Sequence, residues 1–191
     1  LARTVQIERA VVRIEQGVTM TPIHVEPTKP AQSRPTTISS ATFNEQLENV
    51  SPGLPAAIAA FLDEVAPLGV IGDQKTSLSL KWIHPDRGAF HLGSILPSGA
   101  IDTSYANWSG DSVGRLDLTG TYLSALAQLI PGGRVKETPK RTGWYVVGPD
   151  GKFPAVKLLL ANKAGWAAAI EDYTSALTSA LAEPSSSSQP I

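Results

Sequence analysis

The sequence predicts an α+β fold in which an antiparallel three-stranded meander, at about residues 76–106, packs against amphipathic helices. An N-terminal strand pair is expected to dock on this unit or on a partner. Three runs of alternating polar and apolar residues predict the strands, and segments with Pro and Gly between them predict the turns. Because such a sheet has one apolar face, it needs the covering layer that helical patterns before and after it supply. The strand runs are 77–82, 89–96 and 100–106, and the turns are 84–88 and 97–99.

Ahead of the meander, the chain divides into segments of different composition. Residues 1–25 alternate Val and Ile with Arg and Glu, which predicts a strand pair, and we interpret it as the end of an upstream domain in a longer protein. Because two strands alone are marginally stable in water, we expect them to dock on the α+β domain, on an upstream domain or on a partner protein. The other segments are a Pro-rich linker at 26–40, the α+β domain at 41–183 and a disordered tail at 184–191.

Helices are expected on both sides of the meander. Thr42 as N-cap and Glu45 three residues later form a capping-box pattern that predicts a helix to about residue 50. Ser51, which precedes a proline, predicts the start of a second helix, and apolar residues recur at helical spacing as far as Leu68. After the meander we expect a loop at 107–114, a helix at 118–130, strands at 134–136 and 143–147, a short helix at 154–160 and a last helix from residue 163.

The composition excludes several classes of protein. The formal net charge of −1 gives the 191-residue chain no general attraction to nucleic acid or anionic lipid, so any such binding needs a local patch. The absence of cysteine excludes a disulfide framework and a thiolate metal site, and it fits a reducing, cytoplasmic location. No apolar run approaches the roughly 20 residues that a membrane-spanning helix needs, so we expect no membrane partner.

The outward face of the meander carries residue types that act in hydrolysis. A two-residue turn would set His91 opposite Ser104, with Asp102 on the same face. These three residue types are the parts of a nucleophilic site, so a hydrolase that uses His91, Asp102 and Ser104 is one alternative. In the other alternative they form, with Ser79 and Lys81, the solvated face of a half-buried sheet. Because no nucleophile elbow or oxyanion loop accompanies them, we assign no catalytic residue.

Neither a metal nor a cofactor is assigned to the chain. The three histidines, His24, His84 and His91, lack a second ligand of the same type at helix or hairpin spacing. The Gly-rich segments 110–114 and 131–134 lack both the Gly-Lys-Ser/Thr element and the strand-to-helix setting of a phosphate-binding loop. We interpret both segments as ordinary loops.

The strongest polar cluster lies late in the chain. Residues 130–157 contain six basic residues against two acidic ones, a local excess of four positive charges. Basic side chains interleaved with aromatic ones suit phosphate contact and base stacking, so we predict a nucleic-acid-binding site here. In the alternative, the segment is a solvated hairpin whose aromatic residues, Trp144 and Tyr145, pack inward. The predicted site consists of Arg134, Lys136, Lys140, Arg141 and Trp144.

The order of the elements resembles the C-terminal end of bacterial nuclease-like proteins of the PD-(D/E)XK type. The likeness rests on the strand pair at 2–25, a Thr-Phe-Asn-Glu helix start at 42–45, the Ser-Leu-Ser-Leu-Lys-Trp strand at 77–82 and Gly165-Trp166 in the closing helix. The resemblance implies that this chain is the accessory portion after a catalytic core, with no nuclease activity of its own. The family's catalytic residues have no counterpart, because Pro149-Asp150 lies in a Gly-flanked turn with no Glu-x-Lys after it.

Three functions are expected from these observations. The first is a non-catalytic binding or accessory module of a bacterial DNA-metabolism or defence protein, which contacts nucleic acid through the basic cluster or a protein through residues 1–25. The second is a structural or oligomerisation domain whose N-terminal strands complete a sheet in a partner chain. The third is the hydrolase described above.

Overall fold

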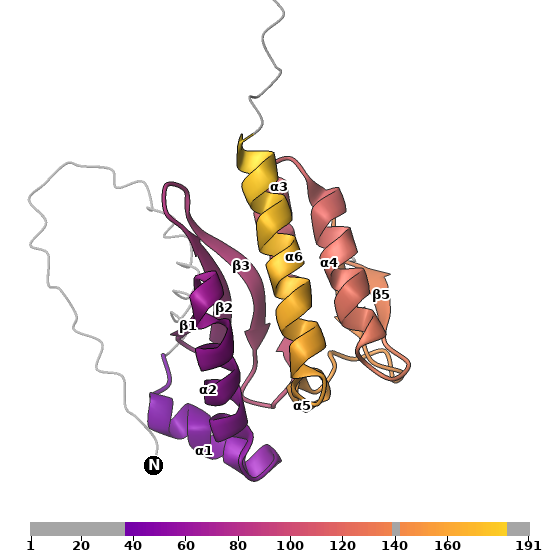
Figure 1. Ribbon diagram of the computed structural model, residues 1–191. Helices are drawn as coiled ribbons and strands as arrows, with labels where there is room; N and C mark the ends of the chain where they lie inside the picture. Colours follow the sequence, from indigo (N-terminus) through magenta and orange to yellow (C-terminus); the bar gives the residue numbers. More distant parts are fainter. Residues whose placement is uncertain (1–36, 139–141, 183–191) are drawn as a thin grey trace, which may run out of the picture. The chain divides into compact units, whose positions relative to one another are not determined.

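The computed structural model describes residues 37–138 and 142–182, whose helices pack on antiparallel strands and confirm the α+β class. Figure 1 shows α2, α4 and α6 in one layer, with strands in a second layer behind them. The strand pair predicted at 1–25, most of the linker predicted at 26–40 and the tail predicted at 184–191 lie outside the described residues. The helices are α1 (Ser40–Val50), α2 (Leu54–Val65), the 3-10 helix η1 (Ala66–Leu68), α3 (Ala106–Ser112), α4 (Leu116–Gln128), α5 (Val156–Leu160) and α6 (Lys163–Ala182). The strands are β1 (Val70–Gln74), β2 (Leu78–His84), β3 (Gly88–Ile95), β4 (Ile101–Asp102), β5 (Arg134–Glu137) and β6 (Trp144–Val147).

The first four strands form one antiparallel sheet in the order β1-β2-β3-β4. β2 and β3 confirm the first two strands of the predicted meander, and the predicted turn joins them at Gly88, whose φ is +79°. β1 is an additional strand at the edge of the sheet that the sequence pattern did not indicate. Its central Gly72 lies against Leu62 and Leu78, where a Cβ would approach their side chains to 3.0 and 2.9 Å.

The third strand of the predicted meander is wrong in length, because β4 ends after Asp102. The Asp102 carboxylate accepts a hydrogen bond of 2.9 Å from the Ser104 backbone N–H, and this local bond turns the chain out of the strand. α3 follows where a loop was predicted at 107–114, so that prediction is also wrong. Gly110 permits the close approach of α3 to α4, because a Cβ at this position would overlap the Thr119 hydroxyl.

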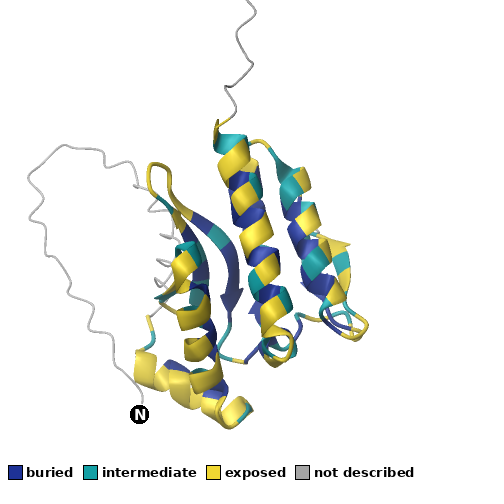
Figure 2. Ribbon diagram, viewed as in Figure 1, coloured by how far each residue is buried: buried dark blue, intermediate teal, exposed yellow. Residues whose placement is uncertain are grey.

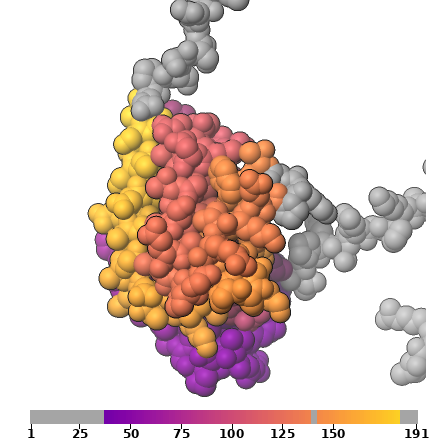
Figure 3. Space-filling model, turned by 90° about the vertical axis from the view of Figure 1, so that its right-hand side faces the viewer, coloured from indigo at the N-terminus to yellow at the C-terminus, as the bar shows by residue number. Residues whose placement is uncertain are grey.

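β5 and β6 confirm the two late strands and form a separate two-stranded antiparallel sheet. This sheet packs on α4, and Figure 3 shows its orange atoms beside the helix. Two side chains from the segment after β4 bind its inner edge. The Val146 N–H donates to the Thr103 Oγ1 over 2.9 Å, and the Asn107 side chain bonds both the N–H and the C=O of Trp144 over 3.0 and 2.7 Å. Thr103 and Asn107 therefore take the place that a neighbouring strand would have.

The core lies between the helix layer and the strand layer, where Figure 2 shows the buried faces of α4 and α6. Phe61 on α2 stacks on Trp166 on α6, with ring centroids 4.0 Å apart. Tyr122 on α4 stacks on Tyr173 on α6 at 4.6 Å. All four rings are buried, so these two pairs hold α6 between α2 and α4.

The first helix begins earlier than the capping-box pattern predicts. Its N-cap is Ser39, whose Oγ accepts a hydrogen bond of 3.1 Å from the Thr42 N–H, so the assignment of Thr42 as N-cap is wrong. We expect Ser39→Ala to lower the free energy of unfolding by about 1 kcal/mol, because an N-H of the first turn loses its partner. Thr42→Ala is the control and is expected to cost clearly less in chemical denaturation. A larger loss for Thr42→Ala would contradict the assignment of Ser39.

Candidate functional site

The cationic side chains of β5 lie on one face of the small sheet. Arg134 and Lys136 alternate along the strand, so they share a face, and both are exposed. Lys136 pairs with Tyr145 across the sheet, which places Tyr145 on the same face. We call Arg134, Lys136 and Tyr145 the cationic face. Lys140 and Arg141 of the predicted site lie outside the described residues.

Trp144 lies on the opposite face of this sheet from the two cations. It pairs with Glu137, and its half-buried ring packs against α4, where a Cβ on Gly120 would lie 3.9 Å from it. Tyr145 makes an edge-on contact with Phe153, with ring centroids 5.6 Å apart. The aromatic ring beside the cationic residues is therefore that of Tyr145.

The charges of the cationic face are not paired within the described residues. Ion pairs there join Lys81 to Asp73, Arg115 to Asp117 and Lys163 to Glu64. Neither Arg134 nor Lys136 pairs with a described carboxylate. Two neighbouring positive charges without a partner among the described residues favour binding of an anion.

The residues of the hydrolase alternative are not assembled as a triad in the described structure. β3 and β4 pair Ser94 with Asp102, and the turn holds three residues instead of two, so the expected pairing of His91 with Ser104 is wrong. The Asp102 carboxylate accepts a hydrogen bond from the Ser104 backbone N–H, and the buried His91 Nδ1 has no hydrogen-bond partner in the part of the chain that the structure describes. His91 instead pairs with Lys81 on β2.

An aromatic patch on the outward face of the larger sheet was not expected from the sequence. The ring centroid of His91 on β3 lies 6.1 Å from that of Tyr105 and 5.6 Å from that of Trp108. The centroids of Tyr105 and Trp108 are 5.1 Å apart. We call these three residues the aromatic patch. No sequence signal pointed to it, because residues 107–114 read as a loop and Trp108 had no expected neighbour.

The aromatic patch belongs to a sheet face that the helix layer leaves uncovered. Four large hydrophobic residues are exposed in the described chain, and three of them, Ile71, Ile83 and Trp108, lie on this face. A Lys81–Asp73 ion pair with an N–O distance of 2.5 Å lies between them, and its hydrogen bond lowers the pKa of the Asp73 carboxyl. Burial, followed by the charge of Lys81, lowers the pKa of His91, so this ring is neutral at neutral pH.

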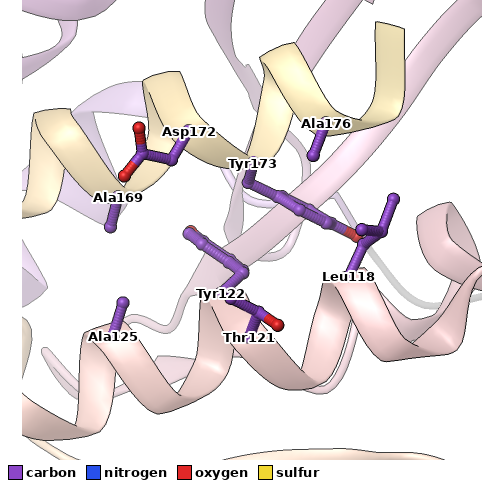
Figure 4. A pocket seen from close by; sticks show the side chains of 8 residues that line it. All are labelled: Leu118, Thr121, Tyr122, Ala125, Ala169, Asp172, Tyr173 and Ala176. Carbon is purple, nitrogen blue, oxygen red and sulfur yellow. The ribbon is translucent and has the colours of Figure 1, made fainter. Parts of the chain in front are cut away.

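A shallow groove lies between α4 and α6 on the helix side (Figure 4). Its floor is the stacked pair of Tyr122 and Tyr173, whose hydroxyls donate hydrogen bonds away from the groove, to the carbonyl oxygens of Leu92 and Ala106. Burial raises the pKa of both hydroxyls, that of Tyr173 to about 12, so both stay protonated at neutral pH. The groove thus offers apolar surface with Asp172 beside it.

Comparisons of the chain with protein-family models, with curated proteins and with solved structures found no match. The resemblance to nuclease-like proteins therefore stays a prediction. Over residues 37–138 and 142–182, no helix has the length and apolar character needed to cross a membrane. In the same residues, no three His, Asp or Glu side chains gather in a way that could hold a metal ion.

Proposed function

We propose that this chain is a non-catalytic binding module that contacts nucleic acid through the cationic face. The observation that carries the proposal is the arrangement of Arg134 and Lys136 beside Tyr145 on one strand face, without a described acidic partner. Lysine and arginine supply phosphate contacts, and an aromatic ring beside them can stack on a base or pack against a sugar.

The local charge supports this proposal more than the net charge does. The chain as a whole carries −1, so it has no long-range attraction to a polyanion. Arg134 and Lys136 are held at a spacing of about 6.7 Å by the strand, which lets a single backbone of nucleic acid contact both. The sheet is itself fixed to α4 and α3, so little conformational entropy is lost when the two residues bind.

The salt dependence of binding tests this proposal. We expect the double substitution Arg134→Gln and Lys136→Gln to weaken binding and to reduce the slope of log K against log salt by about 1.4 on single strands, or about 1.8 on duplex DNA. The measurement is fluorescence anisotropy with labelled oligonucleotides across a salt series. Lys163→Gln is the control, because it removes one exposed charge, paired with Glu64, at the start of α6 on the helix side.

Two outcomes would contradict the proposal. The wild-type chain would bind no nucleic acid at low salt, or the double variant would bind with the affinity and salt slope of the wild type. A loss of log K in the Lys163→Gln control about half as large as in the double variant would show that net charge, and not the cationic face, determines binding.

A further inference from the structure

The side of the described unit that faces away from α2, α4 and α6 carries the aromatic patch as well as the cationic face. The inner face of the larger sheet packs through Leu80 and Leu92 on the helix core, and the inner face of β5–β6 packs on α4. The opposite face of the larger sheet therefore points away from this core, and the opposite face of β5–β6 exposes Arg134 and Lys136, although Val147 on that face is buried. Figure 1 shows the strands behind the layer of α2, α4 and α6. A ligand that binds the cationic face has the aromatic patch on the same side of the molecule.

α3, which carries Trp108, is hydrogen-bonded to both sheets. Asn107 bonds the backbone of Trp144, the residue before Tyr145, and the Ser109 Oγ donates to the His91 carbonyl oxygen over 2.8 Å. Trp108 lies between these two anchored residues in the sequence, yet the residue is 50% exposed. Such an immobilised ring loses little conformational entropy when a ligand covers it.

The two neighbouring rings of the patch do not cover the Trp108 indole by parallel stacking. The planes of His91 and Tyr105 meet the Trp108 plane at 88° and 78°, so neither ring stacks in parallel on the indole. The patch carries little free charge, because the nearby Lys81 is paired with Asp73. Its chemistry suits a flat, uncharged π system, and the cationic face suits phosphate.

We propose that Trp108 stacks on an unpaired base of a single-stranded nucleic acid whose phosphates lie on the cationic face. The inference rests on the function proposed above and names its substrate class. Bases in a duplex are stacked on one another and do not present a face to a side chain, whereas the bases of a single strand do. Tyr105 and His91 support the indole edge-on, which is a favourable arrangement of aromatic rings.

Substitution at Trp108 tests the inference. We expect Trp108→Ala to weaken binding of a thymidine homo-oligonucleotide by roughly 5- to 150-fold and to leave binding of a duplex of equal charge unchanged. Trp108→Phe keeps a stacking face and is expected to retain most of the affinity. Trp82 and Trp166 are buried and Trp144 is half-buried, so quenching of tryptophan fluorescence by the oligonucleotide should arise mainly from Trp108 and should be lost in Trp108→Ala.

The outcomes separate this inference from the function on which it rests. Trp108→Ala could bind the single strand like the wild type while the Arg134 and Lys136 substitutions weaken binding. That result would support nucleic-acid binding by the cationic face and would show that the stacking proposal is wrong. Equal losses on single strand and duplex would also overturn it. A change in sedimentation of Trp108→Ala with unchanged oligonucleotide affinity would identify the patch as a protein interface instead.

Discussion

Replacement of Trp166 by alanine is expected to lower the free energy of unfolding by about 3–5 kcal/mol, the largest single effect we predict. Trp166 has no exposed surface, and its ring lies 4.0 Å from Phe61 at an interplanar angle of 14°. The substitution removes the contact that joins α6 to α2 and leaves a cavity that the surrounding helices cannot close fully. Urea denaturation monitored by far-UV circular dichroism measures the loss.

Two further variants show whether the position of Trp166 causes this loss. Trp166→Phe keeps a ring against Phe61, so we expect less than half of the destabilisation. Trp108→Ala is the matched tryptophan control, because half of the Trp108 surface is exposed and its removal is expected to cost about 0.5 kcal/mol. A loss at Trp166 no larger than that at Trp108 would contradict the placement of Trp166 in the core.

The parts of the fold that depend on local pattern could be predicted from the sequence. Alternation of polar and apolar residues predicts β2 and β3, and Pro85 and Gly88 predict the turn that joins them. Apolar residues at helical spacing predict α2, α4 and α6. β1 could not be recognised in this way, because Gly72 and Asp73 interrupt its apolar pattern. Its place is set by pairing with β2 and by packing on Leu62, which are tertiary contacts.

α3 was missed because its stability comes from its neighbours. The segment contains Gly110, Asp111 and two serines, which have low helix propensity and indicate a loop. In the structure, hydrogen bonds from Asn107 and Ser109 fix the helix to β6 and β3, and the missing side chain of Gly110 lets α4 approach. The two hydrogen-bond partners lie 18 and 37 residues away in the sequence, so the local pattern does not reveal them.

The candidate binding residues show the same limit. Alternation alone places Arg134 and Lys136 on one face of a strand, so the cationic pair followed from the sequence. Trp144 and Tyr145 are adjacent, so only one of them can lie beside those cations, and the choice depends on the pairing register with β5. The length of the turn before β4 sets the pairing register of β3 with β4 in the same way. One more residue in this turn than expected means that His91 does not pair with Ser104.

Asn107→Ala is expected to lower the free energy of unfolding by about 2–4 kcal/mol, because it leaves three backbone groups without their partner. The Asn107 side chain accepts from the Trp144 N–H and donates to the carbonyl oxygens of Trp144 and Ser104, with distances of 3.0, 2.7 and 2.7 Å. Only 6% of the residue is exposed, so water replaces these bonds incompletely. Amide exchange should become faster in β6 than in β2, because the lost bonds anchor the small sheet.

The matched control is Asn162→Ala, which removes an exposed asparagine bonded to the Leu129 carbonyl oxygen and is expected to cost less than about 1 kcal/mol.

Asn107→Asp adds a test of the hydrogen-bond directions. A carboxylate cannot donate to the two carbonyl oxygens, so burial beside them should raise its folded-state pKa above the usual value of about 3.9. The destabilisation relative to wild type should therefore be smaller at pH 4 and grow as the pH rises to 7, when the carboxyl must ionise in place. Asn107 anchors β6, the strand that carries Tyr145, and Asn107 also directly precedes Trp108. The same variants should therefore weaken oligonucleotide binding. An amide-exchange rate in β6 equal to that of the wild type would contradict this anchoring role.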